Sequence, residues 1–325
     1  MFSDILSRQR KILPMRRLRF LSLIALSIAL SPASLRSQTA SMRTRYLPTL
    51  TNPEIEQYLK HNDVIFVPVG TVETFGAMPS DMEYRMAEAY AVKMAEEADG
   101  LILPHVTYFY PGVTVTGRAS VYVPEDLGEA YLKQIAHSLL RQGFRRQIYL
   151  SAHGPSDQFV SGMVRQFFEE TKDPVLYIHL PLLNRRTQSA RGGVNTFRSV
   201  GYGAYYILGR LNDIPLALDV PKPEQPPLPR PPASLSILSP LAPESSAVGS
   251  YDPDPEHNGG RPLGNIRMSA AERERLGKEG AALIEANIKA VNIKAVVQAL
   301  KDEDKYVHDV ILPRFRDILP ADKTQ

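Results

Sequence analysis

The chain has 325 residues, of which 43% are hydrophobic and 22% charged, a balance typical of globular proteins that excludes wholesale disorder, collagen and coiled coil. It contains no cysteine, so disulfides, thiolate zinc sites, iron–sulfur clusters and a cysteine nucleophile are excluded as well. The formal net charge is +3, but residues 1–33 hold six basic residues against one acidic residue, so the remainder has no basic excess. Nucleic-acid binding is therefore not expected.

The amino terminus has the pattern of an export signal. Six basic residues precede the apolar run 20–30, which is too short to span a bilayer, and the small residues 31–33 follow it. We expect a cleaved signal peptide over residues 1–33, with Met15 as an alternative start, and a periplasmic or extracellular mature protein without a stable membrane span. The alternative is an uncleaved amino-terminal membrane anchor with the rest of the chain outside.

The body of the chain alternates apolar strands with amphipathic helices. The apolar run 64–69 is rich in β-branched residues and is followed by Gly70, which indicates a buried strand, and the segment 82–98 has helical periodicity. Alternation of this kind predicts an α/β fold, a three-layer α/β/α arrangement with a mainly parallel central sheet. Strands are expected at 64–69, 101–103, 147–150 and 175–180, helices at 82–98, 125–143, 156–171 and 269–301, and a hairpin edge at 118–123.

A proline-rich stretch interrupts this alternation. Nine prolines among residues 221–243 exclude a helix or a central strand there. We interpret residues 221–250 as an extended excursion, a linker or surface strap, with a docking arm for a neighbouring subunit as the alternative. The expected organisation is then a signal peptide at 1–33, an α/β domain at 46–220, the proline-rich excursion, and a helical part of the same domain at 251–325.

Candidate ligands follow the predicted strands at their carboxyl ends, where open parallel sheets bind ligands. Glu73, His105 and His153 follow the first, second and third strands, and His179 lies at the end of the fourth. Two or three converging groups of this kind would hold a divalent metal such as zinc, manganese or iron. The segment 70–76 lacks a P-loop lysine and the dinucleotide glycine spacing, so nucleotide binding has no support.

Three segments carry recognisable motifs: Pro68-Val-Gly-Thr-Val-Glu-Thr-Phe-Gly76, Ser151-Ala-His-Gly154 and Gly277-Lys-Glu-Gly280. In that order and spacing they resemble the creatininase family of metal-dependent amidohydrolases. The likeness covers residues 50–215 and, more weakly, 264–290. It implies a small-molecule amide substrate and a homo-oligomer, which in this family is usually a hexamer.

The resemblance also implies a set of metal ligands. Glu73 matches the first metal-binding glutamate of the family, and His153 matches its metal-binding histidine. If one deletion is allowed, Glu83 falls on the bridging aspartate. The alternative role of Glu83 is a capping box with Ser80 at a helix start. The corresponding alternatives are a water-facing Glu73 and an ordinary loop histidine at position 153.

Other positions depart from the family pattern. Phe75 stands where the family has a second metal-binding histidine, and Pro155 where some members have a second glutamate ligand. A later family motif falls near residues 199–206, which contain neither His nor Glu. A reduced site with one divalent metal is therefore expected. The residues retained as substitute ligands or as pocket wall are Asp81, Asp157, His105, His179, Phe75 and Tyr202.

The sequence favours an exported creatininase-like hydrolase that uses one divalent metal to cleave a non-peptide or cyclic amide C–N bond. One alternative is a non-catalytic binding or assembly protein with the same fold. Another is an enzyme of altered chemistry, such as cyclisation or dehydration. Metal content distinguishes the first two, because the hydrolase needs about one divalent ion per chain and the binding protein needs none.

Overall fold

The computed structural model describes residues 42–76, 78–188, 196–218 and 266–320, together with Ile237 and Tyr251. The expected signal peptide, and the expected proline-rich excursion apart from Ile237, lie outside these residues. The chain from Arg43 onward forms one compact unit. Within the described part of the chain, none of the helices combines the length and the apolar character needed to cross a bilayer.

A parallel sheet of four strands, in the order β2-β1-β3-β4, forms the centre of this unit. In the central pair, Phe66 lies opposite Ile148. Every residue of β1 is buried, as expected for a strand covered on both faces. Each of the four strands expected from the sequence is confirmed to within one residue at either end. The strands are β1 (Val64–Pro68), β2 (Leu101–Ile102), β3 (Arg146–Ser151) and β4 (Leu176–His179), and a separate antiparallel pair consists of β5 (Ala217–Leu218) and β6 (Ile266–Arg267).

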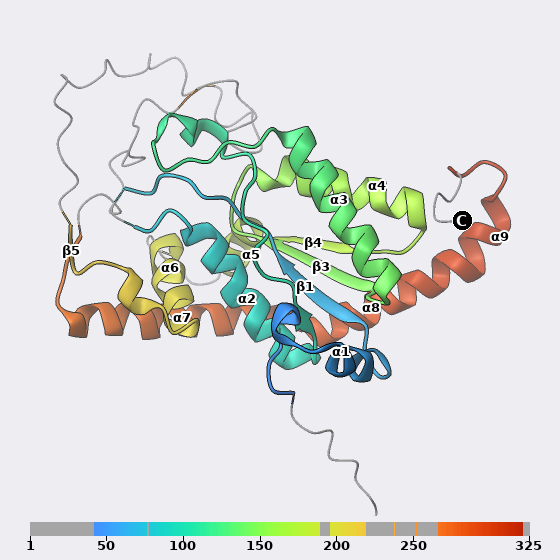
Figure 1. Ribbon diagram of the computed structural model, residues 1–325, viewed down its shortest axis with the longest axis horizontal. Coiled ribbons are helices and arrows are strands. Elements are labelled where there is room, and N and C mark those ends of the chain that lie inside the picture. The colour runs from blue at the N-terminus through green and yellow to red at the C-terminus, as the bar shows by residue number, and fades with distance from the viewer. Residues whose placement is uncertain are drawn as a thin grey trace, which may run out of the picture. The chain divides into compact units, whose positions relative to one another are not determined.

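Helices cover both faces of the sheet. They are α1 (Asn52–Leu59), α2 (Met82–Ala98), α3 (Glu125–Gln142), α4 (Ser156–Thr171), α5 (Leu180–Gln188), α6 (Thr196–Ile207), α7 (Ala270–Val291), α8 (Ile293–Tyr306) and α9 (Leu312–Phe315). Figure 1 shows α3 and α4 over one face, and α2 and α8 over the other, with α6 and α7 beside α2. This is the three-layer α/β/α fold expected from the sequence. Short helical turns are η1 (Leu47–Thr49), η2 (Gly112–Thr116), η3 (Leu211–Asp213) and the π-helical η7 (Val307–Ile311).

Local signals in the sequence explain where helices begin and end. At the start of α1, the Glu54 carboxylate accepts a hydrogen bond from the Thr51 backbone N–H at 2.7 Å, which completes a capping box. α3 ends at Gly143, whose φ of 104° is strained for any residue with a side chain. The predicted bounds of α2 and α4 agree with the structure.

The long helix expected over residues 269–301 is wrong, because two helices occupy this stretch. Asn292 separates α7 from α8 with a left-handed backbone conformation, φ 50°. Its side chain then accepts a hydrogen bond from the Ala295 backbone N–H at 3.4 Å and caps α8. Asparagine tolerates this conformation better than most residues, so one side chain ends the first helix and starts the second.

The hairpin edge expected at 118–123 is also wrong. We call residues 103–124 the β2–α3 segment; apart from η2 and an isolated parallel bridge between Val106 and Val69, it is irregular. Residues 118–123 pair with no strand, and the Val121 backbone N–H instead donates to the Val72 carbonyl, in the loop after β1, at 2.9 Å. The alternation of apolar residues here does not mark a buried face, because Val121 and Tyr122 are both exposed.

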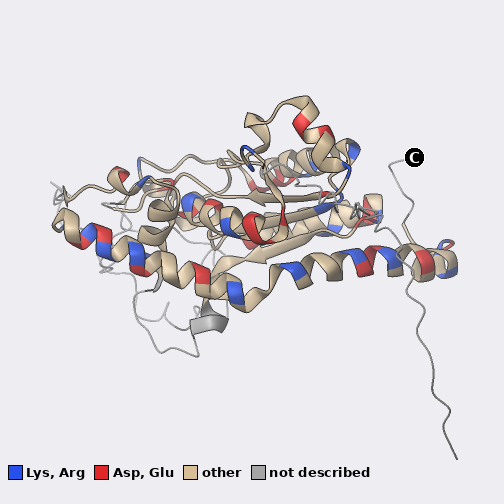
Figure 2. Cartoon of the chain, turned by 90° about the horizontal axis from the view of Figure 1, so that it is seen from below, with Lys and Arg blue, Asp and Glu red and all other residues tan. Residues whose placement is uncertain are grey.

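The carboxyl-terminal helices combine a close-packed inner side with a charged outer side. A Cβ atom on Gly203 of α6 would lie 2.1 Å from the backbone of Gly280 in α7, so these helices touch at their glycines. The Gly277–Gly280 motif therefore has a packing role. Figure 2 shows Lys, Arg, Asp and Glu along the length of these helices, and Arg275 pairs there with Glu272 at 2.6 Å.

Candidate metal centre

Three buried side chains meet at the carboxyl end of the sheet: Glu73, Glu83 and His153. The Nδ1 atom of His153 lies 2.6 Å from Oε2 of Glu83 and 3.1 Å from Oε1 of Glu73. One ligand atom from each residue can be chosen so that all three lie within 4.8 Å of one another. The structure thus brings together the three residues that the family resemblance selected as metal ligands.

The two carboxylates reach this point from one continuous piece of chain. Glu73 lies on the loop after β1, and its backbone N–H donates to the Ser80 carbonyl at 3.0 Å, which folds the loop back on itself. Glu83 lies in the first turn of α2. Asp81 is the N-cap residue, and no side chain caps this helix. The capping box considered for Ser80 and Glu83 is therefore absent, and the Glu83 carboxylate faces His153.

Hydrogen bonds from its backbone and from its ring orient His153. Its backbone N–H donates to Oγ of Ser151, the last residue of β3, at 3.2 Å. Its Nε2 atom lies 2.9 Å from the carbonyl oxygen of Tyr110. Because a carbonyl oxygen only accepts, Nε2 carries the hydrogen, and in the neutral ring the lone pair is on Nδ1. That lone pair faces the two carboxylates.

A hydroxyl group holds the other side of Glu73. Oγ1 of Thr114, in η2, donates a short hydrogen bond to Oε2 of this carboxylate. Neither Thr114 nor the Tyr110 carbonyl was predicted from the sequence as part of the site. Backbone carbonyls carry no residue-type signal, and Thr114, one of two threonines in η2, gives no indication in sequence of the carboxylate that it contacts.

Burial and mutual charge set the protonation of the three groups in the absence of metal. Burial raises the pKa of Glu83, and the nearby Glu73 carboxylate raises it further, to about 8. For His153, burial lowers the pKa, but the two carboxylates outweigh this and hold it well above its ordinary value. Burial also opposes ionisation of Glu73, yet His153 and the hydrogen bonds to the carboxylate keep its pKa lowered.

This donor set fits one divalent metal ion. Two ionised carboxylates and a neutral imidazole would leave a buried double negative charge, which is costly unless a cation or protons neutralise it. A histidine and two carboxylates are a ligand combination found in catalytic zinc sites, and other divalent metals accept the same atoms. Among the described residues, no other three His, Asp or Glu side chains come together in this way.

The two substitute aspartates lie outside this cluster. Asp81 accepts a hydrogen bond from the Tyr205 hydroxyl at 2.6 Å and pairs with Arg85 at 2.7 Å. Asp157, in the first turn of α4, accepts from Oγ of Ser161 at 3.1 Å. Asp81 is thus bonded to residues of α2 and α6, and Asp157 to a residue of α4.

The remaining candidates are also separate from the three residues. His105 is exposed, has a φ of 70°, and donates its backbone N–H to the Tyr84 hydroxyl at 2.8 Å. His179 ends β4 and lies with its ring 5.9 Å from that of Tyr177. Tyr202 is fully buried, with its hydroxyl 3.7 Å from the sulfur of Met268, so it packs in the core.

The two positions that depart from the family pattern carry no ligand atoms. The Phe75 side chain is buried in the hydrophobic core, where its ring stacks on Phe197 with centroids 5.9 Å apart. Pro155 precedes α4 as its N-cap residue. Neither a phenyl ring nor a pyrrolidine ring offers a lone pair to a metal.

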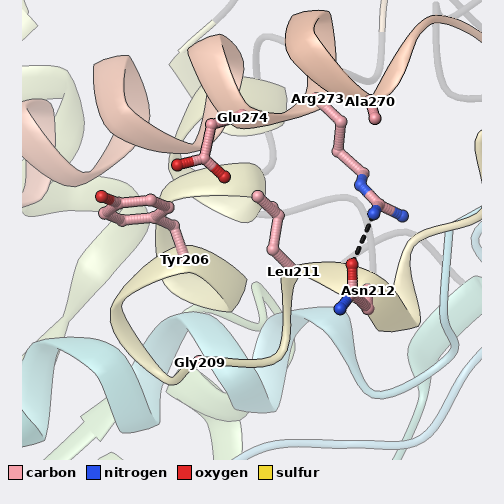
Figure 3. A pocket seen from close by; sticks show the side chains of 7 residues that line it. All are labelled: Tyr206, Gly209, Leu211, Asn212, Ala270, Arg273 and Glu274. Carbon is pink, nitrogen blue, oxygen red and sulfur yellow. Dashed lines mark hydrogen bonds between the residues drawn. The ribbon is translucent and has the colours of Figure 1, made fainter.

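A pocket elsewhere in the unit does not involve these residues. A cavity of about 380 Å³ lies between η3, the end of α6 and the start of α7. Figure 3 shows the residues that line it. Tyr206 and Leu211 contribute apolar surface, while Arg273 is held by Asn212 at 2.5 Å. Glu73, Glu83 and His153 are not among the residues that line it.

Comparison with known proteins relates this arrangement to a family. Residues 48–201 match the sequence model of Creatininase, creatinine amidohydrolase. A 3-dehydro-scyllo-inosose hydrolase from Thermotoga maritima is 30% identical over 142 residues, which are 42% of this chain and 44% of that protein. The match thus spans less than half of the relative's length.

Solved structures share the fold at low sequence identity. A crystal structure of creatinine amidohydrolase (creatininase) superposes with a TM-score of 0.56 at 17% identity, covering 80% of this chain and 99% of that one. A mutant creatininase of Zn–Zn type gives 0.54 at 17% identity, covering 81% and 99%. The sequence match over residues 48–201, just under half of the chain, and the shared fold relate this chain to the creatininase family.

Proposed function

We propose that this protein is a divalent-metal-dependent hydrolase of small carbonyl compounds. The observation that carries this proposal is the buried group of Glu73, Glu83 and His153, placed at the carboxyl end of a parallel sheet with three ligand atoms within 4.8 Å of one another. A bound divalent ion would polarise a substrate carbonyl and lower the pKa of a water molecule.

The protein's own groups hold and orient this centre. Glu73 and Glu83 supply negative charge from two sides, and His153 supplies the Nδ1 lone pair once it is deprotonated. The Tyr110 carbonyl fixes the imidazole orientation through Nε2. Because all three ligand side chains are buried, water competes little for their lone pairs, and their charges act in a low-dielectric environment.

The substrate class we propose first is a non-peptide or cyclic amide, cleaved at its C–N bond. Support comes from the match of residues 48–201 to a family that is described as creatinine amidohydrolase. A second substrate class is a dehydro-inosose, because the 30% identical relative is named for hydrolysis of such a compound. Positions Phe75 and Pro155, which lack ligand atoms, favour a centre with one metal ion over a centre with two.

The test combines metal content with activity. The purified protein is loaded with zinc, manganese or iron, freed of excess metal, and measured for bound metal and for hydrolysis of cyclic amides and of a dehydro-inosose. We expect about one divalent ion per chain and hydrolysis of one substrate class. Glu73→Gln should lose both properties. Glu169→Gln, which changes a partly exposed carboxylate on α4 that pairs with Arg165, should keep both. A folded wild-type protein that binds no divalent ion would instead support the non-catalytic alternative.

We further propose that the protein works outside the cytoplasm. The basic and apolar pattern of residues 1–33 supports this location. Amino-terminal sequencing of the exported protein should find a start at or after Ser34. Recovery of residues 1–33 intact in a membrane fraction would support the anchored alternative.

A further inference from the structure

The β2–α3 segment contacts two of the three candidate ligands, His153 and Glu73. Its Tyr110 carbonyl accepts from Nε2 of His153 at 2.9 Å, and its Thr114 hydroxyl donates to Oε2 of Glu73. From these contacts we propose that Thr114 is a positioning residue for the metal centre, which holds the Glu73 carboxylate so that Oε1 is presented to the ion. This inference rests on the proposed function, since it assigns a role within the same site.

The Thr114 hydroxyl has two acceptors within reach but one hydrogen. Besides the Glu73 carboxylate, the Pro111 carbonyl lies 2.8 Å from Oγ1. An ionised carboxylate is the stronger acceptor, so the hydrogen goes to Oε2 of Glu73. The other oxygen of the same carboxylate, Oε1, is the one that lies 3.1 Å from Nδ1 of His153. Fixing one oxygen in this way orients the other.

The backbone around Thr114 is itself fixed on two sides. Oγ of Ser120 donates to the Thr114 carbonyl at 2.6 Å and accepts from the Thr74 backbone N–H at 3.2 Å. These bonds attach η2 to the loop that carries Glu73. On the other side, Phe109 stacks on Phe159 of α4 with ring centroids 4.9 Å apart. The hydroxyl is therefore delivered from a held backbone, as positioning requires.

Removal of such a supporting hydrogen bond lowers metal affinity about 10- to 100-fold in metal sites generally. We expect this loss for Thr114→Val, which keeps the branched shape and removes the hydroxyl. Thr114→Ser restores the hydroxyl and should bind metal within about threefold of the wild type. Thr71→Val is the matched control: Thr71 is also buried, but its hydroxyl lies 3.4 Å from the Phe109 carbonyl and touches no ligand.

The experiment is a titration of each full-length protein with Co²⁺ against a competing chelator. Affinity is read from the titration, and ligand geometry from the visible absorption spectrum of the bound cobalt. The melting temperature of each metal-free variant shows whether it is folded. Thr114→Ala is measured in parallel, in case the valine variant does not fold. Its smaller side chain also lacks the hydroxyl but cannot clash with the loop after β1.

The inference expects weaker binding and an altered cobalt spectrum in Thr114→Val or Thr114→Ala, recovery of both in Thr114→Ser, and no change in Thr71→Val. Equal affinity and an equal spectrum in wild type and the hydroxyl-free variants would overturn this inference and leave the proposed function standing. An equal loss in Thr71→Val would also overturn it, since general loosening of the segment would then be the cause. Absence of Co²⁺ binding in the wild type would overturn the proposed function and this inference together.

Discussion

Glu73 and Phe75 are two residues apart on one loop, yet their surroundings are opposite in character. The carboxylate of Glu73 contacts the imidazole of His153 and the hydroxyl of Thr114. The ring of Phe75 lies in the hydrophobic core and stacks on Phe197. One short stretch of chain thus joins a polar cluster to an apolar core.

This difference separates two properties that mutations can address independently. The polar side, formed by Glu73 with Glu83, His153 and Thr114, offers atoms that could ligate a metal and the charge that such an ion would neutralise. The apolar side anchors the loop, because the buried Phe75 ring holds it against α6. Substitutions on the first side should therefore act mainly on metal binding, and substitutions on the second side mainly on stability.

The largest expected effect is the loss of metal binding in His153→Ala. This change removes the only nitrogen ligand of the cluster, so affinity should fall by more than about 100-fold, beyond the cost of losing a supporting residue. Isothermal titration with Zn²⁺ measures it. His137→Ala is the control, since His137 also pairs with a carboxylate, Glu170, at 2.8 Å, but on the far helices α3 and α4. Tight zinc binding by the His153 variant would refute the assignment of this ligand.

On the apolar side, Phe75→Ala should lower the free energy of unfolding by about 4 kcal/mol, because it leaves a cavity in a packed core. Urea denaturation of the metal-free protein measures the change. The Zn²⁺ affinity of the folded fraction should fall by less than about tenfold, since no ligand atom is lost. Phe75→Leu fills most of the cavity and should recover much of the stability. A loss of metal binding as large as in His153→Ala would show that the two sides are not separable.

The fold was largely predictable, because strand and helix patterns dominate its sequence. Apolar runs such as 64–69 and amphipathic segments such as 82–98 bury their side chains in the way that their periodicity indicates. The failures involve tertiary context. Asn292 divides a continuous helical pattern through its backbone conformation, and residues 118–123 bond to a loop where an edge strand was expected. Neither outcome is encoded in local hydrophobic periodicity.

The candidate site was predictable only where a motif marked it. Glu73 and His153 stand in recognisable motifs, and Glu83 was selected by its spacing from them, although a helix cap was an equal alternative. Periodicity does not predict that Glu73 faces the polar cluster and Phe75 the core. Residues two apart share a face predictably only in a regular strand, and both of these lie on a loop. Thr114 and the Tyr110 carbonyl reach the site through a segment whose path depends on contacts distant in sequence.

The polar side should also make stability depend on pH. In the metal-free protein, the pKa of Glu83 is raised from its ordinary 4.5 to about 8, and that of His153 is raised as well. Between pH 4.5 and about 8, Glu83 keeps its proton in the folded state and loses it in the unfolded state. The folded state therefore binds more protons, and the free energy of unfolding falls as the pH rises towards 8. Metal binding displaces the same protons, so metal affinity should rise over that interval.

Melting temperatures between about pH 5 and 8, with a chelator and with Zn²⁺, measure both trends. The stabilisation by zinc should grow with pH. Glu83→Gln cannot ionise, so relative to this variant the metal-free wild type should lose stability as the pH rises. If the melting temperature of the metal-free wild type rises relative to that of Glu83→Gln between about pH 5 and 8, the raised pKa of Glu83 is contradicted.

The smallest expected effect is on metal stoichiometry in Phe75→His. The family has a metal-binding histidine at the corresponding position, so this change restores one donor to the apolar side. A second site needs further ligands near it, and His105 is exposed while Asp157 bonds to Ser161 on α4. No cluster among the described residues includes these side chains. The variant should therefore still bind about one divalent ion per chain and gain no hydrolysis of creatinine, as measured by elemental analysis and a creatinine assay.

Phe75→His should also lose about 2 kcal/mol in the free energy of unfolding, because the core provides no hydrogen-bond partner for the imidazole that replaces the phenyl ring. Two ions per chain, with creatinine hydrolysis, would show that the apolar side retains a nearly complete second metal site.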